Sequence, residues 1–193
     1  MKKLLIVLSI FISLTTEAQE FHTGTQVLSA GIGFGSNWGF GRGGTQTPAL
    51  SVSYEQGIWD IDGPGVISLG GYIGHKSYKY KYNSPYYWYN EKLSYTIIGL
   101  RSAYHFNMID ADKLDLYAGA MLSFNLAKYK YDYGYHDPSY GYRQDFNRSN
   151  TYGNHLGISF YGGARYYFSD NMAVFGELGY GVAYLNIGVA FKL

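Results

Sequence analysis

The last ten residues of the chain, 184–193, alternate strictly between two kinds of side chain. The odd positions are large and apolar: Leu185, Ile187, Val189, Phe191 and Leu193. The even positions between them are small or polar: Asn186, Gly188, Ala190 and Lys192. Successive side chains of a β-strand point to opposite sides, so this period of two predicts a strand with one apolar and one small or polar face. A strand of a soluble sandwich has the same pattern, so where the protein resides depends on further features.

Seven earlier segments repeat this alternation, and the sequence therefore predicts an all-β protein of eight antiparallel strands. The expected strands are 25–36, 47–56, 66–80, 93–106, 113–131, 151–168, 172–180 and 184–193. Each reaches the roughly 9–11 residues that a tilted membrane crossing needs. One face is bulky and the other mostly Gly, Ala and Ser. Because an eight-stranded interior has little room, we expect the bulky face to point outward to lipid, as in an up-and-down transmembrane barrel. A soluble ligand-holding barrel would place its large apolar side chains inside.

The N-terminus has the pattern of a secretory signal peptide. Lys2 and Lys3 precede an apolar run from residue 4 to 14, and small residues follow at Thr16 and Ala18. This order predicts cleavage after Ala18 and a mature barrel domain at 19–193. The apolar run is too short for a membrane-spanning helix.

Composition narrows the function classes. The chain has no Cys, so disulfides and a lipid-anchored cysteine are excluded, and its 26 Gly disfavour helices. Removing residues 1–18 takes two lysines and one glutamate from 15 basic and 14 acidic residues, which leaves 13 of each. A neutral chain offers no general attraction for nucleic acid. The 23 Tyr suit a membrane interface, where an aromatic ring with a polar tip is favoured.

The connections also alternate in length, with long loops expected at 37–46, 83–91 and 132–150 and short turns between the other strands. Only the last connection, at 181–183, departs from the alternation, because it is short where a long one is expected. Outer-membrane barrels have short periplasmic turns and longer outer loops. Eight strands then return both termini to the periplasm.

The ending GYGVAYLNIGVAFKL resembles the signal by which outer-membrane barrels are recognised for insertion, with Asn186, Gly188, Phe191 and Leu193 at the matching positions. Together with the leader, the eight strands and the Gly and Tyr bias, it makes the chain resemble a small porin-family barrel of the OmpA/OmpX type, in the style of Bacteroidetes-like Gram-negative bacteria. The resemblance implies a monomer integral to the outer membrane, with the barrel-assembly machinery and outer-membrane lipids as partners. It transfers no catalytic residue.

Four ionisable residues fall on the inward register: Glu55, Arg101, Arg165 and Glu177. A lone charge in a narrow barrel is strongly penalised, whereas two acids and two guanidinium groups can satisfy one another. We therefore expect an interior network that plugs the lumen. The alternative is a narrow passive channel for water or small ions, with these charges along its path.

Two surface features suggest contacts outside the barrel. Lys79, Lys81, Lys128 and Lys130 fall on the lipid-facing register near strand ends, where they could meet lipopolysaccharide phosphates or simply be solvated. Aromatic residues in the long loops could contact an extracellular ligand. These candidates are Trp38, Tyr86, Tyr87, Trp88, Tyr89, Tyr135, Tyr140 and Tyr142.

Enzymatic and metal sites are weakly supported. His75 and Ser77 resemble the His-x-Ser pair of lipid A deacylases, but they lie early in the chain without an acid to orient the histidine. The other histidines, at 22, 105, 136 and 155, lack paired metal-ligand spacing, so we expect no metal or cofactor. The sequence therefore predicts a non-enzymatic barrel whose role, in adhesion, surface protection or partner binding, lies in its outer loops.

Overall fold

The computed structural model describes residues 21–35, 44–61, 65–107, 113–137, 142–151, 153–180 and 182–193. The expected signal peptide lies outside them. The strands of the described residues are β1 (Gln26–Phe34), β2 (Thr45–Gln46), β3 (Ala49–Ile61), β4 (Gly65–Asn83), β5 (Tyr87–Phe106), β6 (Leu114–Asp137), β7 (Tyr142–Thr151), β8 (His155–Tyr167), β9 (Met172–Gly179) and β10 (Leu185–Lys192). Among these described residues there is no helix long and apolar enough to cross a membrane.

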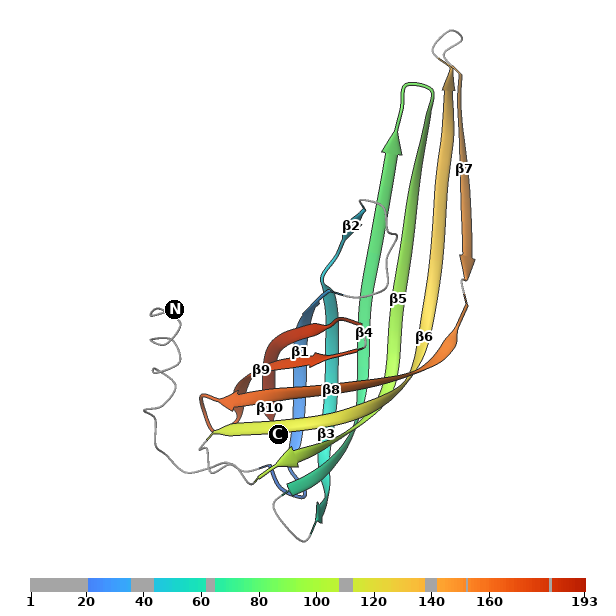
Figure 1. Cartoon of the computed structure of the whole chain (residues 1–193). Helices are drawn as coiled ribbons and strands as arrows, with labels where there is room; N and C mark the ends of the chain where they lie inside the picture. The colour runs from blue at the N-terminus through green and yellow to red at the C-terminus, as the bar shows by residue number, and fades with distance from the viewer. Residues whose placement is uncertain are drawn as a thin grey trace, which may run out of the picture.

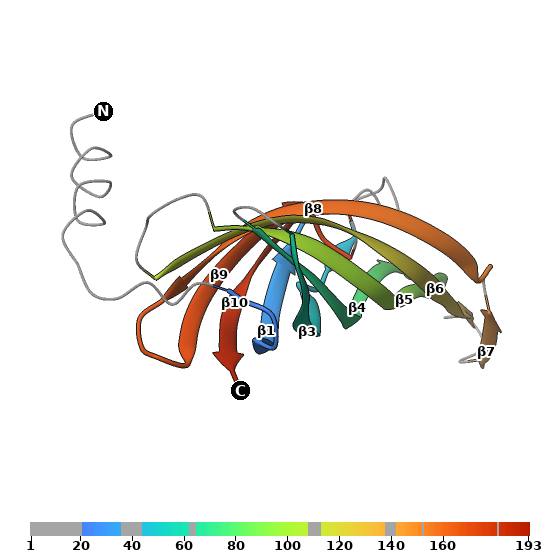
Figure 2. The same ribbon diagram turned by 90° about the horizontal axis from the view of Figure 1, so that it is seen from below.

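Eight of the ten strands close into an antiparallel barrel. Each strand pairs with the next in the order β1, β3, β4, β5, β6, β8, β9 and β10, and β10 pairs back with β1. Figure 2 views this ring from below, with β10, β1 and β3 on the side opposite β8. The expected eight-stranded barrel is confirmed, and closure leaves none of these strands as a free edge within the ring.

The alternation of the sequence becomes an inside and an outside in the ring. Outward positions carry exposed apolar side chains on every strand, for example Ile32, Val52, Ile98 and Ile187. Inward positions carry small residues where the wall is crowded: a Cβ on Gly31 would lie 2.7 Å from Asn186 Oδ1. Tyr72, Tyr117, Tyr161, Tyr167 and Phe175 fill the remaining interior. The bulky, apolar face therefore points away from the barrel axis.

Three ring strands continue well beyond the ring as one side of a tall sheet. β4, β5 and β6 rise past the other strands in Figure 1, and β7 pairs with the upper part of β6. We call this the upper sheet and define it by residues 77–83, 87–94, 128–137 and 142–151. It is a single layer, since no other described strand packs over either of its faces.

The upper sheet is where the structure departs from the sequence prediction. Residues 132–150 are expected as the longest loop, yet β6 continues to Asp137 and β7 occupies 142–151. The Tyr-rich segment 83–91 is likewise mostly strand, with only residues 84–86 between β4 and β5. β3 also extends through Trp59 to Ile61, where a turn is expected. Alternating tyrosines continue the strand pattern, because cross-strand aromatic pairs stabilise a sheet that has no apolar core.

Candidate functional site

The lower part of the barrel interior holds a compact charged cluster around Arg165 on β8. Its side chain is 2% exposed and forms ion pairs with Glu55 of β3 and, at 2.8 Å, with Asp115 of β6. Asp115 also meets Nδ1 of His105 at 2.7 Å, and Nε2 of His105 meets the Ser68 hydroxyl at 3.1 Å. The guanidinium lies 5.1 Å from the centre of the Tyr117 ring. Two carboxylates thus share one guanidinium, and a histidine takes up the remaining acceptor.

Ser68, His105 and Asp115 have the hydrogen-bond order of a nucleophile, a base and an orienting acid. Their surroundings do not suit catalysis, because the three side chains are buried, and Ser68 is only 1% exposed. Asp115 is shared with Arg165, and the Ser68 hydroxyl also lies 3.4 Å from the Ala103 carbonyl. The arrangement therefore satisfies buried polar groups rather than exposing a reactive hydroxyl.

The N-terminal segment packs against the barrel beneath this cluster. Phe21 is buried and stacks on His105 with ring centres 3.6 Å apart, and Asn107 Nδ2 donates to its carbonyl at 2.9 Å. Gly24 N donates to the Gly57 carbonyl and Gly57 N to the Thr25 carbonyl, both at 2.9 Å. The chain at 21–25 is therefore fastened to β3 and packs against the lower cluster through Phe21.

A second charged cluster lies higher in the interior. Arg101 of β5 reaches across the lumen to Glu177 of β9, with Nη2 and Oε2 2.7 Å apart. Tyr117 donates to the same carboxylate oxygen at 3.2 Å, and Arg101 Nε donates to the Tyr161 hydroxyl at 3.1 Å. The guanidinium also lies 4.1 Å from the centre of the Tyr161 ring. The pair joins β5 and β9, which lie three places apart in the ring.

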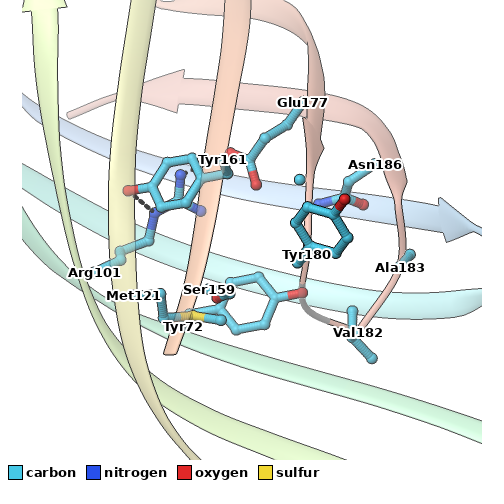
Figure 3. A pocket seen from close by; sticks show the side chains of 11 residues that line it. Tyr72, Arg101, Met121, Ser159, Tyr161, Glu177, Tyr180, Val182, Ala183 and Asn186 are labelled. Carbon is cyan, nitrogen blue, oxygen red and sulfur yellow. Dashed lines mark hydrogen bonds and ion pairs between the residues drawn. The ribbon is translucent and has the colours of Figure 1, made fainter. Parts of the chain in front are cut away.

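A small cavity adjoins this cluster (Figure 3). Tyr72, Arg101, Glu177 and Asn186 are among its lining residues, and the space open to the centre of a water molecule is about 30 Å³. One water needs roughly 10–15 Å³ on this measure. The cavity therefore has room for two or three waters and none for a solute of metabolite size.

The structure places the four predicted interior charges in two separate ion pairs, Arg165–Glu55 and Arg101–Glu177, rather than in one network. Sequence reasoning missed Asp115 and His105, which complete the lower cluster. Asp115 stands on the predicted inward register of its strand and pairs directly with Arg165 in the sheet. The position of Asp115 on the inward register could therefore have identified it from the sequence. Its partner, Arg165, is known only from the strand pairing. Lys76 is a further buried cation, whose Nζ donates to the Gly35 carbonyl at 3.2 Å.

The upper sheet carries different chemistry on its two faces. The face that continues the barrel interior holds a nearly unbroken set of aromatic rings: Tyr78, Tyr80, Tyr82, Tyr87, Tyr89, Tyr129, Tyr131, Tyr133, Tyr135 and Phe146. Neighbouring rings are in contact, as in Tyr82–Tyr89 at 5.3 Å and Tyr133–Phe146 at 4.8 Å between centres. We call this the tyrosine face. Of the aromatic loop candidates, Trp38 and Tyr140 lie outside the described residues.

The opposite face of the upper sheet, which continues the outer side of the barrel, carries lysines. The four predicted ones are all exposed strand residues, and Lys92 joins them. Lys79 pairs directly with Lys92 across β4 and β5, and Lys92 with Lys130 across β5 and β6. We call these three the lysine row. Lys81 and Lys128 flank it on the same face.

The other residues singled out in the sequence are ordinary parts of the barrel wall. Asn186 points inward, and its Nδ2 donates to the Ser51 hydroxyl at 3.0 Å, whereas Phe191 and Leu193 are exposed outside. His75 is exposed and Nδ1 meets the Thr96 hydroxyl at 2.9 Å instead of Ser77. In the part of the chain that the structure describes, no group of three or more His, Asp or Glu residues is arranged to hold a metal ion.

Comparison with known proteins gives a likeness in fold only. No protein-family model matches the sequence. No curated protein matches it either. The chain is similar in structure to Ail, the attachment invasion locus protein of Yersinia pestis, in a crystal structure with the heparin analogue sucrose octasulfate: 10% identity, 88% of this chain, 98% of that chain and a TM-score of 0.44. A second crystal structure of Ail covers the same shares at 10% identity with a TM-score of 0.37. The ring of strand pairs, rather than this likeness, establishes the barrel.

Proposed function

We propose that the protein is an integral outer-membrane barrel without catalytic activity, whose interior is closed and whose role is carried by the upper sheet. The observation behind the proposal is the distribution of side chains in the ring. Exposed Leu, Ile, Val and Phe cover its outside, while Arg101 and Arg165 form ion pairs with carboxylates inside. In water such an exposed apolar belt would drive aggregation, whereas in a bilayer it is the surface that lipid requires.

The interior supports a plugged barrel better than a channel. Arg101–Glu177 crosses the lumen, the cluster around Arg165 fills the level below it, and Phe21 packs against that cluster. The cavity beside Arg101 holds only a few waters. A channel for water or small ions is the second candidate, because Arg101 and Glu177, two of the charges expected along such a path, line this cavity.

The upper sheet supports a role in contact with other molecules. It extends beyond the apolar belt as a single layer and presents tyrosines on one face and lysines on the other. Rigid tyrosines offer amphipathic contact area at low entropic cost. We infer a role in adhesion, surface protection or partner binding, with membrane lipids and the barrel-assembly machinery as the remaining partners of a monomeric barrel with both termini in the periplasm.

An unboiled-versus-boiled gel of an outer-membrane fraction tests insertion. A compact barrel should run fast and slow down after boiling. Recovery of the protein in the soluble periplasm, without a band shift, would refute the proposal.

Single-channel recording in a planar bilayer tests the closed interior. Arg101→Ala should lower the temperature of the gel-shift transition without opening a large conductance, because Tyr72, Met121 and Tyr161 still fill this level. A normal transition with large new currents would instead favour the channel. Mass spectrometry of lipid A from a deletion strain tests the absence of enzymatic activity, for which unchanged lipid A is expected.

A further inference from the structure

We propose that the lysine row, Lys79, Lys92 and Lys130, binds phosphate groups of the glycolipid in the outer leaflet of the membrane that surrounds the barrel. This inference rests on the proposed insertion into an outer membrane. It concerns the outward face of the upper sheet alone and names the ligand of that face by its chemistry: a lipid anchored beside the barrel whose headgroup carries phosphate.

The first observation is that the row brings like charges together. Directly opposed residues on neighbouring strands have Cβ atoms about 4.5–5.5 Å apart, and like charges there destabilise a sheet. The row repeats this twice, from β4 to β5 and from β5 to β6. Lys81 and Lys128 add two more positive charges at neighbouring positions of the same face. An anion between the lysines would turn this repulsion into attraction.

The second observation is that the sheet supplies little negative charge of its own here. We consider the rows of directly paired residues that contain the five lysines. Among the described residues of these rows, the outward carboxylate is Asp132, which lies 3.5 Å from Lys130 in an exposed pair. Such a pair contributes little. Asp145 of β7 adds a second outward carboxylate one level higher, opposite Gly134. Five lysines therefore face two carboxylates, and the surface keeps a positive excess.

The third observation is the height of the row above the apolar belt. On β6 the outward side chains run from Leu122 and Phe124 to Leu126, then Lys128 and Lys130. Two residues advance about 7 Å along a strand, so on β6 the lysines begin one step above the last apolar side chain and continue for one more step. On β4 and β5, Lys79 and Lys92 lie six residues, or about 20 Å along the strand, beyond Ile73 and Ile98. The face therefore enters the headgroup zone, where lipid phosphates lie, at Lys128 on β6, and the row extends from there away from the apolar belt.

The fourth observation is that solvation alone does not account for the placement. Both faces of the upper sheet are open, since Tyr82, Tyr87 and Tyr135 are also exposed on the tyrosine face. Yet all five lysines of its described residues are on the outward face, the one that continues the lipid-facing side of the barrel. Arg148 is the described cation of the tyrosine face, so the outward face holds five of the six described Lys and Arg side chains of the sheet. This excess on one face fits an anion held on one side, as it is beside a membrane.

The test uses the mature chain refolded in a zwitterionic detergent, with its gel shift recorded first. Native mass spectrometry then counts bound molecules of lipid A that carries both phosphates, and of the same lipid A after their removal. We expect binding of the phosphorylated form at low salt and loss of most of it at high salt. A variant with Lys79→Gln, Lys92→Gln and Lys130→Gln should bind about a hundredfold more weakly, because each lysine near an anionic surface contributes roughly fivefold.

A matched control removes three positive charges elsewhere: Lys113→Gln and Lys192→Gln, near the other end of the barrel, and Arg148→Gln on the tyrosine face. It should bind like the unmodified chain. Lys92→Glu gives a second readout, because a carboxylate in the middle of the row should raise the melting temperature in the absence of glycolipid while weakening its binding.

Equal binding of the dephosphorylated lipid A, or undiminished binding by the triple variant, would overturn the inference. Tighter binding of inositol hexakisphosphate from solution than of phosphorylated lipid A would also overturn it, since the ligand would then be a soluble polyanion. A missing gel shift would instead count against the inserted barrel, so the two failures are distinguishable.

Discussion

The barrel ring and the upper sheet are built from the same strands but reverse their chemistry along them. On β4, β5 and β6 the outward positions change from Ile73, Ile98 and Phe124 in the ring to lysines above it. The inward positions change from small residues and paired charges to the tyrosine face. The period of two never breaks. The period of two therefore predicts that these segments are strands. Which face carries the apolar residues depends instead on the surroundings of each part of the strand.

The two regions are also stabilised differently. The ring gains from closure, from tight inward packing and from buried ion pairs that join distant strands, such as Arg165 with Glu55. The upper sheet has no enclosed core, and its side-chain contacts are cross-strand aromatic pairs such as Tyr89–Tyr131 at 6.0 Å. We therefore expect the ring to unfold as one cooperative unit and the upper sheet to open locally at lower free energy.

The largest effect is expected from Arg165→Ala in the ring. The substitution leaves Glu55 and Asp115 buried without their guanidinium partner, which destabilises a protein by about 3–5 kcal/mol. The temperature of the gel-shift transition should fall accordingly, and hydrogen exchange should accelerate throughout the ring.

Arg148→Ala is the control for this prediction, because it removes an exposed arginine from the upper sheet. Its effect on the transition should stay within about 0.5 kcal/mol. Equal effects of the two substitutions would show that the buried pairs do not distinguish the ring from the upper sheet.

A smaller and local effect is expected from Tyr133→Ala in the upper sheet. Its ring contacts Tyr131 and Phe146, with centres 5.3 and 4.8 Å apart, and loss of these two aromatic pairs should cost about 2 kcal/mol. Amide exchange in residues 128–151 should accelerate while the ring keeps its transition temperature. Tyr86→Ala, at the 65% exposed tip between β4 and β5, should leave exchange unchanged. A lowered transition temperature of the whole barrel would show that the two regions unfold together.

The alternation of the sequence was sufficient to predict the eight ring strands and their faces, because burial on one side leaves a mark at every second residue. The prediction of a loop at 132–150 was wrong for a related reason. β7 has the sequence YRQDFNRSNT, and both of its faces are open to solvent. Phe146, which stacks on Tyr133, is its one apolar side chain with an aromatic cross-strand contact among the described residues. A strand without a buried face has no hydrophobic pattern to detect.

The interior charges show the same limit. Inward register identified Glu55, Arg101, Arg165 and Glu177, but the pairing of Arg101 with Glu177 joins β5 to β9 across the lumen. The stagger of the strands decides which charges meet, and that stagger is a property of the closed ring. The lysine row depended on it too, since Lys92 is aligned with Lys79 and Lys130 only by the strand pairing.

The smallest effect concerns protonation in the upper sheet, where the pKa of Tyr131 is raised by burial and by the nearby Glu91 carboxylate. A raised pKa means that the folded sheet favours the neutral ring, so this contribution to stability is present below the ordinary pKa of tyrosine, about 10, and is lost as pH rises through the folded value. Glu91→Gln should bring the pKa of Tyr131 back toward its ordinary value. NMR titration of the tyrosine Cζ carbons measures this directly. An unchanged titration of Tyr131 would show that Glu91 does not contribute to the raised pKa. Charges on the tyrosine face would then be screened by water, in contrast to the buried charges inside the ring.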